Sequence, residues 1–269
     1  DIGCGNGKFL GELSHRFPRY RLSGYDPEVA LTKHFKSSKH INYYHGELED
    51  IPHEYDLICF IDSLSYIDDI SSLFAFLDSH ISPDGQIFIT SPDVSRNNMT
   101  LLVDGQSYFF TAANLSSIFS KFGYQLDLID VSKVFPRHIF GVAKKFGRVA
   151  LPVVDSDKVL NDAARYMTNL RRNYGRIAKI AHGLNSDGYR LGVLGTKHNS
   201  AITIAELGDD IKFVADETKT MVGKNFHGIK VVHPSELGQD DIVLLPYGRS
   251  SRSIKARYQS QVKARFVEL

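Results

Sequence analysis

The sequence predicts an α/β protein with two units, each alternating strands and helices around a largely parallel sheet. Three observations predict this class. A glycine-rich turn at residues 1–7 runs directly into an apolar helical pattern, and short apolar strands then alternate with helical segments as far as Lys144. After one long helical stretch, a second alternating series begins at Arg190. A chain of 269 residues with 42% hydrophobic residues has enough apolar side chains for two cores.

The first unit is expected at residues 1–148. Apolar spacing of three and four, with Pro18 as a stop signal and Thr111 as a helix cap, marks its helices, and short apolar runs mark its strands. Helices are predicted at Lys8 to Phe17, Pro27 to Phe35, Ser71 to Ile81 and Ala112 to Phe122. Strands are predicted at Arg21 to Tyr25, Ile41 to Tyr44, Asp56 to Ile61, Gln86 to Ser91, Gln125 to Val134 and His138 to Lys144, with a turn at Pro83 to Gly85.

A linking helix is expected within residues 149–184 and a second α/β domain at 185–269. Apolar residues three and four apart predict one helix from Asp155 to Ala181, with a break between Gly183 and Gly188. The second domain should then contain a helix from Ser200 and strands at Arg190 to Leu194, Ile211 to Ala215, Lys230 to Val232 and Asp241 to Leu245.

Charge and cysteine content limit the partners. The 32 basic and 31 acidic residues give a net charge of +1, so no electrostatic case exists for nucleic acid or an anionic membrane. Cys4 and Cys59 show no paired spacing, and no apolar run is long enough to span a membrane, which favours a reduced, cytoplasmic protein. The eleven histidines are scattered, so no metal site is predicted.

The chain opens on what reads as the last residues of a central strand, with no initiator methionine. A central strand reduced to residues 1–4 would leave ladder hydrogen bonds of its neighbours unpaired. We therefore expect a longer parent chain to supply a strand immediately before Asp1.

The glycine-rich turn has the composition of a nucleotide cradle. Gly3, Gly5 and Gly7 lack the Cβ atoms that would keep a ligand from the backbone, and they permit positive φ between strand and helix. About 20 residues further on, Asp26 ends the next apolar run, where a nucleotide-binding unit places a carboxylate for two ribose hydroxyls. The same composition also occurs in ordinary tight loops, and Asp26 could simply cap a helix before Pro27.

The order of motifs resembles the class I S-adenosylmethionine-dependent methyltransferases. The chain reads Asp-Ile-Gly-Cys-Gly-Asn-Gly, then Tyr-Asp-Pro at 25–27, then Gly-Glu-Leu-Glu-Asp-Ile-Pro at 46–52 before the strand Tyr-Asp-Leu-Ile. Phe9 and Leu10 stand where a dinucleotide-binding pattern needs its last glycine, which disfavours a nicotinamide site. The resemblance implies a seven-stranded Rossmann-like sheet, with its first strand truncated here, and S-adenosyl-L-methionine as cofactor. The cofactor-binding positions it implies are Asp1, Gly3, Gly5, Asn6, Gly7, Asp26, Pro27, Glu47, Leu48, Ile61 and Asp62, with Asp26 at the ribose and Glu47 near the adenine amino group.

The second domain resembles the C-terminal domain of sugar C-methyltransferases, which act on a nucleotide-linked ketosugar. The matching segments include 192–196, Asp-Glu-Thr-Lys at 216–219 and His-Gly-Ile-Lys-Val at 227–231. Two departures stand against the carbon-alkylation chemistry. Residues 103–106 replace a His-Glu-His stretch of that family, and His-Ile-Phe-Gly at 138–141 replaces its His-Gly-Gly-Ser loop.

A methyl transfer needs an acceptor held in line with the cofactor and a group that removes a proton. The candidate catalytic residues are His138, which the resemblance places best, followed by Tyr66 and Tyr108, while Asp62 could orient the cofactor instead. The expected partner is a small-molecule substrate, with a nucleoside-diphosphate sugar as the acceptor class. The alternative is a non-catalytic nucleotide-binding scaffold in a biosynthetic complex.

The second domain is expected to face the methyltransferase cleft and to position a diphosphate. Lys197, His198 and the loop at 247–250 are the residues for this role. A domain that only covers the first sheet or forms a homodimer is the alternative, because loops at strand ends are polar in any such fold.

Overall fold

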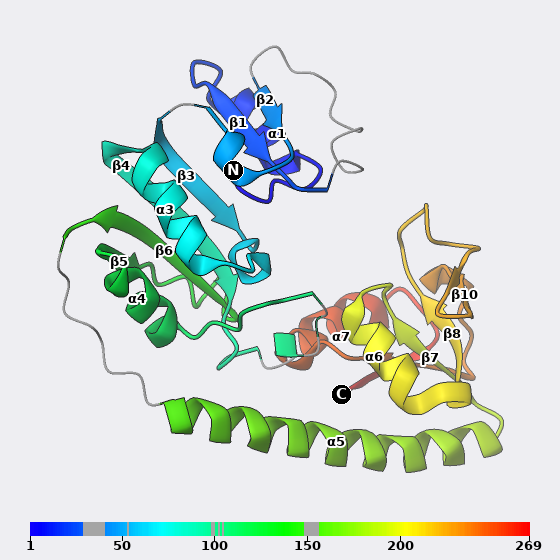
Figure 1. Cartoon of the computed structure of the whole chain (residues 1–269). Helices are drawn as coiled ribbons and strands as arrows, with labels where there is room; N and C mark the ends of the chain where they lie inside the picture. The colour runs from blue at the N-terminus through cyan, green and yellow to red at the C-terminus, as the bar shows by residue number, and fades with distance from the viewer. Residues whose placement is uncertain (29–40, 53, 98–99, 102, 104, 148–155) are drawn as a thin grey trace. The chain divides into compact units, whose positions relative to one another are not determined.

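A computed structural model gives the fold (Figure 1). It describes residues 1–28, 41–52, 54–97, 100–101, 103, 105–147 and 156–269. The chain divides into two compact units, Asp1–Ala163 and Ala164–Leu269, and each is described by itself. The helix predicted at Pro27 to Phe35 lies almost wholly outside the described residues.

The first unit contains two sheets. Two parallel strands form one of them, β1-β2, and the other has the order β3-β4-β6-β5. β3 and β4 are parallel, whereas β6 runs antiparallel to both β4 and β5. The strands are β1 (Leu22–Tyr25), β2 (Ile41–Tyr44), β3 (Tyr55–Ile61), β4 (Ile81–Pro92), β5 (Tyr124–Leu128) and β6 (His138–Lys145), and the helices are α1 (Lys8–Arg16), α3 (Ile70–His80) and α4 (Ala112–Lys121).

Residues 1–4 connect these two sheets. Ile2 forms a parallel bridge with Tyr25 of β1, and its N–H donates to the Cys59 carbonyl of β3 at 2.9 Å. The N–H groups of Gly3 and Cys4 both donate to the Tyr25 carbonyl. The short segment therefore lies between β1 and β3, where the first strand is predicted, and a seven-stranded sheet stays a prediction.

Helices α3 and α4 supply much of the core of this unit. Leu73, Phe74 and Leu77 of α3 are buried together with Leu115 and Phe119 of α4 and the apolar side chains of β3 and β4. Apolar burial of this kind stabilises a fold by about 25 cal/mol per Å² removed from water. The predicted cap of α4 is confirmed, because the Thr111 hydroxyl accepts from the Asn114 N–H while the Asn114 side chain accepts from the Thr111 N–H.

The turn predicted at Pro83 to Gly85 falls inside the span assigned to β4, where pairing passes directly from Tyr55 with Ile81 to Leu57 with Gln86. Residues 82–85 leave the ladder and fold back, since a Cβ at Gly85 would lie 2.7 Å from the Ile81 side chain. One strand end in the first unit is predicted wrongly. β5 ends at Leu128, not Val134, because the Asp130 carboxylate accepts the Ser132 N–H and turns the chain away from the sheet.

The second unit holds a six-stranded sheet of order β12-β11-β7-β8-β10-β9. All neighbouring strands are parallel except β9, which is antiparallel to β10. The strands are β7 (Arg190–Leu194), β8 (Ile211–Ala215), β9 (Asn225–Phe226), β10 (Ile229–Val232), β11 (Asp241–Leu245) and β12 (Arg265–Glu268). The helices are α6 (His198–Leu207) and α7 (Ser251–Gln259), and α5 (Ser156–Ser186) spans the boundary between the units (Figure 1).

The two faces of this sheet carry separate cores. Val193 and Leu244 pack with Ile204 of α6 and Ala181 of α5, whereas the alternate positions on the same strands pack with Tyr258 of α7. Alternation of this kind follows from the two-residue period of a strand. Helices α6 and α7 thus cover opposite faces of the sheet.

The break predicted between Gly183 and Gly188 is confirmed, although helix α5 runs past the predicted end at Ala181 to Ser186. The Asp187 N–H donates to the Gly183 carbonyl at 3.0 Å and keeps the helical pattern up to that point. The chain leaves the helix at Gly188, whose φ of 87° is open to glycine at little cost. Among the described helices, none is both long and apolar enough to cross a membrane.

Candidate functional site

The glycine-rich turn has the backbone that its sequence predicts. Gly3, Gly5 and Gly7 have φ values of 74°, 53° and 69°, a region that side chains other than glycine rarely adopt. Gly7 is the residue before α1 and has no side chain to cap the helix, while the Asn6 side chain accepts from the Lys8 N–H of the first turn. Other backbone N–H groups of a first helical turn have no partner within the helix and can donate to a ligand.

The three glycines differ in what surrounds them. A Cβ at Gly3 would lie 2.4 Å from the Cβ of Ser63, so glycine is required there for packing against the end of β3. A Cβ at Gly5 would meet no atom within 4 Å. The open side of the turn is therefore at Gly5, where a ligand could approach the backbone.

Asp26 follows β1 directly and joins this turn. Its side chain is buried, and its Oδ2 accepts from the Gly5 N–H at 2.8 Å while its Oδ1 accepts from the Glu28 N–H at 3.0 Å. The bond to Gly5 brings together two positions of the predicted cofactor site. The bond to Glu28 is the local turn that the capping interpretation predicts, so Asp26 also has a structural role.

A second loop lies against β1. The Tyr25 hydroxyl donates to the Gly46 carbonyl at 2.7 Å, and Gly46 has a φ of 100°. Glu47 follows as an exposed residue before the turn Leu48–Asp50. The phenol of Tyr25 thus joins the loop with Glu47, predicted near the adenine, and the cofactor candidate Leu48 to the strand that precedes Asp26.

The remaining cofactor candidates surround the turn. The Asn6 side chain accepts from the Lys8 N–H at 3.3 Å, and Pro27 is exposed next to Asp26. The Asp1 Oδ1 atom is buried without a hydrogen-bond partner among the described residues. A buried acceptor with no partner has a free-energy cost of about 1–3 kcal/mol, which a bound donor would relieve.

Asp62 stands directly after β3 in a strained conformation, with a φ of 57°. Its N–H donates to both the carbonyl and the hydroxyl of Thr90, each at 3.1 Å, and the Thr90 hydroxyl donates to Asp62 Oδ1 at 2.9 Å. These bonds hold Asp62 in a conformation that costs about 1–3 kcal/mol.

His138 lies next to Asp62, whose carboxylate bonds to Thr90. Its Nε2 atom lies 3.4 Å from Asp62 Oδ2. Burial favours the neutral carboxyl, but hydrogen bonds from His138 and Thr90 outweigh it and hold the pKa of Asp62 below its ordinary value. The Asp62 carboxylate therefore stays ionised next to the His138 imidazole.

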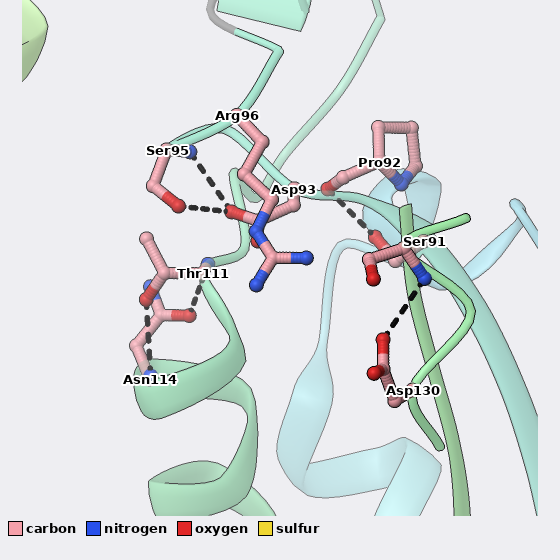
Figure 2. Close-up of polar contacts among 9 residues, drawn as sticks. Ser91, Pro92, Asp93, Ser95, Arg96, Thr111, Asn114 and Asp130 are labelled. Carbon is pink, nitrogen blue, oxygen red and sulfur yellow. Dashed lines mark hydrogen bonds and ion pairs between the residues drawn. The ribbon is translucent and has the colours of Figure 1, made fainter. Parts of the chain in front are cut away.

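The loop after β4 is held together by the Asp93 carboxylate, as Figure 2 shows. Asp93 is buried and accepts from the N–H and hydroxyl of Ser95 at 2.9 and 2.6 Å, and Arg96 pairs with the same carboxylate at 3.4 Å. The Asp93 N–H donates to the Arg137 carbonyl, and Pro92 is the register partner of His138. The start of β6 is thereby held against the end of β4.

The two tyrosine candidates are placed differently. The Tyr108 hydroxyl donates to the Asp68 carbonyl at 3.0 Å, and the Ser107 hydroxyl donates to the Asp68 carboxylate. Tyr66 is half-exposed in a short turn after β3, next to Gly105. The phenol of Tyr108 therefore already has a hydrogen-bond acceptor in this structure.

Ser63 and Thr90 also bond to the segments that carry the candidate residues, although the sequence alone gave neither of them a firm role. The Ser63 hydroxyl donates to the Ile2 carbonyl, which joins the end of β3 to the glycine-rich segment. Thr90 had no signal, because a threonine within an apolar run reads as an ordinary strand residue. Only the pairing of β3 with β4 shows that it faces Asp62.

Two more observations bear on ligands. Within the part of the chain that the structure describes, no group of three or more metal-ligating side chains gathers. Cys4 and Cys59 are both buried and free.

Comparison with known proteins shows what the first half of the chain is similar to. Residues 1–129 match the model of a methyltransferase domain family. Residues 1–129 are therefore similar to methyltransferase domains.

The curated relative is a trans-aconitate 2-methyltransferase of Deinococcus radiodurans. It is 23% identical over 157 residues, which cover 51% of this chain and 61% of that protein, so less than two thirds of its length is matched. The plantazolicin methyltransferase BpumL, solved with S-adenosylhomocysteine, is 14% identical, with 54% of this chain and 75% of that chain covered and a TM-score of 0.46. A methyltransferase of Mesorhizobium loti is 16% identical, with 53% and 88% covered and a TM-score of 0.42.

The residues around the glycine-rich turn fit a nucleoside-bearing cofactor. Gly5 and Gly46 each leave open space where a Cβ would stand, and the Asp26 carboxylate lies beside Gly5. The first turn of α1 begins directly after Gly7. A carboxylate acceptor and the backbone donors of a helix start are therefore present together.

Proposed function

We propose that this chain is an S-adenosylmethionine-dependent methyltransferase that transfers a methyl group to a small-molecule acceptor. One observation carries the proposal: the glycine-rich turn, Asp26, Asp62 and His138 belong to segments that meet at one edge of the strands. The bonds from Gly5 to Asp26 and from Ser63 to Ile2 join these segments. Ligands of open parallel sheets bind outside the carboxyl ends of the strands, where these residues stand.

In the proposed cofactor site, Asp26 accepts from the two ribose hydroxyls and Glu47 lies near the adenine amino group. The other members are those that the family resemblance implies: Asp1, Gly3, Gly5, Asn6, Gly7, Pro27, Leu48, Ile61 and Asp62. The open space at Gly5 and the unpartnered Asp1 Oδ1 support this assignment. Bound cofactor would replace the Gly5 N–H or the Glu28 N–H as a partner of Asp26.

His138 is the proposed base. S-adenosylmethionine supplies a methyl group that is already activated as part of a sulfonium. The chain must then hold the acceptor in line and take its proton, and the imidazole of His138 can accept it while ionised Asp62 compensates the new charge. Thr90 holds Asp62 in position for this task.

The proposed acceptor is a nucleotide-linked sugar or a related carbohydrate metabolite. The support is the resemblance of segments 192–196 and 216–231 to sugar C-methyltransferases. A panel of nucleoside-diphosphate sugars, free sugars and trans-aconitate, the acid named for the Deinococcus relative, would test this class. Turnover of the acid without turnover of any sugar nucleotide would reject it.

Cofactor binding and catalysis need separate measurements. Calorimetry with S-adenosylmethionine should show one site that Asp26→Asn weakens, and transfer of a labelled methyl group to the acceptor panel should show turnover. Binding without turnover on any nucleophile would favour the non-catalytic scaffold. Absence of binding would reject both functions.

A further inference from the structure

The second unit has a pocket of its own, at the carboxyl ends of β7 and β8. It is open to solvent and has a volume of about 220 Å³ between these strands, the segment after β11 and helix α7. Its polar lining includes Asp216, Glu217 and Thr218, and its apolar lining includes Tyr247, Ile254 and Tyr258. A pocket with one apolar wall and a few convergent polar groups is typical of small-molecule sites.

This pocket stands where the winding of the sheet changes direction. From β7 the chain passes through α6 to β8 on one side, whereas β11 and then β12 lie on the other side. Helices α6 and α7 cover opposite faces of the sheet, so the loops after β7 and β11 leave the sheet toward opposite faces. Such switch points leave a crevice that binds ligands in open α/β sheets.

Asp216 occupies the same place in this unit as Asp26 does in the first. Each follows the second strand of a strand-helix-strand unit and accepts with one oxygen from the N–H two residues ahead, Glu28 for Asp26 and Thr218 for Asp216, at 3.0 and 2.8 Å. The other oxygen reaches back to the turn after the preceding strand. Asp26 meets the Gly5 N–H 21 residues earlier, and Asp216 meets the Thr196 hydroxyl 20 residues earlier.

The Asp216 carboxylate stays ionised in its buried position. Asp216 is only 9% exposed, and burial alone would favour its neutral form, but the hydrogen bonds from Thr196 and Thr218 hold its pKa below the ordinary value. A charged acceptor in a pocket binds pairs of hydroxyl donors well.

The rest of the wall suits a flat, partly apolar group. The Tyr247 hydroxyl donates to the Leu194 carbonyl at 2.7 Å across Gly195, where a Cβ would lie only 2.1 Å from that hydroxyl oxygen. Gly195 therefore lets the Tyr247 ring close one side. Arg257 pairs with both oxygens of Glu217 at 2.8 and 2.6 Å, which neutralises the second carboxylate of the lining.

We propose that this pocket binds the nucleoside part of a ribonucleotide, with Asp216 accepting hydrogen bonds from the two ribose hydroxyls and the base lying against Tyr247 and Ile254. The ribose hydroxyls replace the Thr196 hydroxyl and the Thr218 N–H as donors. The site is complete within residues 164–269 and does not depend on the methyltransferase assignment of the first unit.

Titration of the full chain with ribonucleoside diphosphates tests the site. S-adenosylhomocysteine is added first at saturation so that the cofactor site is filled. ADP, GDP, CDP and UDP are then compared with their 2′-deoxy forms by calorimetry, and at least one ribonucleotide should bind about tenfold or more tightly than its deoxy form. Equal affinity for both forms, or no binding of any nucleotide, would overturn the proposal.

Three variants separate a ligand contact from a structural role. Asp216→Asn should weaken the ribonucleotide at least tenfold, whereas Thr196→Val breaks the same internal bond but keeps the carboxylate and should retain binding. Loss of binding in both variants would show that the bond between Thr196 and Asp216 only keeps the turn in shape, and it would overturn the proposed ribose contact. Asp26→Asn is the matched control: it should weaken S-adenosylmethionine and leave the ribonucleotide unchanged, so failure of either site is seen separately.

The nucleoside could belong to a free nucleotide or to the acceptor. Comparing UDP with UDP-glucose, and ADP with ADP-glucose, distinguishes these sources. Tighter binding of the sugar conjugate assigns the pocket to the acceptor, and equal binding assigns it to a free nucleotide. Both results support a nucleoside site.

Discussion

His138 Nε2 and Asp62 Oδ2 lie 3.4 Å apart, although the two residues come from strands far apart in the sequence. Asp62 ends β3, His138 begins β6, and β4 stands between them with Thr90 bonded to Asp62. A histidine oriented by a carboxylate is a general base in many enzymes because the carboxylate stabilises the imidazolium that forms. The relationship supports His138 over Tyr108, whose hydroxyl already donates to a carbonyl.

Replacing His138 by glutamine should lower kcat by about 10²–10⁴-fold, the range that a general base contributes. Affinity for S-adenosylmethionine should not change, since His138 is assigned to the acceptor. Steady-state kinetics and calorimetry measure the two quantities. Tyr66→Phe and Tyr108→Phe are the matched comparisons, and a full loss of kcat in either one with His138→Gln still active would move the role of base to that tyrosine.

Alanine at Gly3 and alanine at Gly5 should have different effects. Both positions have positive φ, which costs a side chain about 1–2 kcal/mol. At Gly3 the new Cβ also meets Ser63, so the free energy of unfolding should fall further and the melting temperature with it. At Gly5 the Cβ enters open space, so stability should fall less while affinity for S-adenosylmethionine falls more. Thermal melts and calorimetry on both variants check this, and the reverse order would place the cofactor elsewhere.

Replacing Asp26 by alanine should weaken the binding of S-adenosylmethionine by about 2–4 kcal/mol, because a charged acceptor of two hydrogen bonds is lost. The bonds from Gly5 and Glu28 mean that stability should also fall. Calorimetry at a temperature well below the melting point separates the two effects. A variant that melts earlier but binds the cofactor as the parent does would leave Asp26 with the turn-stabilising role alone.

Because of the Cys4 thiol, the free energy of unfolding should fall as the pH becomes alkaline. Burial raises the pKa of its thiol to about 11 from an ordinary value of 9.0, and Asp26 adds to this. The unfolded chain therefore loses the proton first as pH rises. The stability contribution is full below the ordinary pKa and declines from about pH 9 toward pH 11.

Denaturant unfolding across that alkaline range checks the effect. Cys4→Ala should be less stable at neutral pH because it leaves a small cavity, but its stability should fall less steeply with pH. Identical slopes for the parent and the variant would contradict the assignment. Slow labelling of Cys4 by a maleimide in the native protein should accompany the raised pKa.

Short-range patterns in the sequence were enough to predict many of the strands and helix ends. Strands β2, β7, β8 and β11 begin and end where their apolar runs predict, and Thr111 caps α4 as expected. Each depends on residues a few positions apart. The ends of other elements differ from the prediction: β5 stops at Leu128 and α5 runs on to Ser186, because neighbouring strands and helix hydrogen bonds outweigh the preferences of single residues.

The sequence by itself determined the glycine turn, the carboxylate about 20 residues beyond it and the order of strands and helices, because turn chemistry and periodicity are local properties. The tertiary structure decided which distant residues meet. Sheet order brings Thr90 and His138 to Asp62, and the fold of the second unit brings Asp216 to Thr196 and Tyr247 to Leu194. These contacts depend on how strands pair across long stretches of chain, and a linear pattern carries no such information.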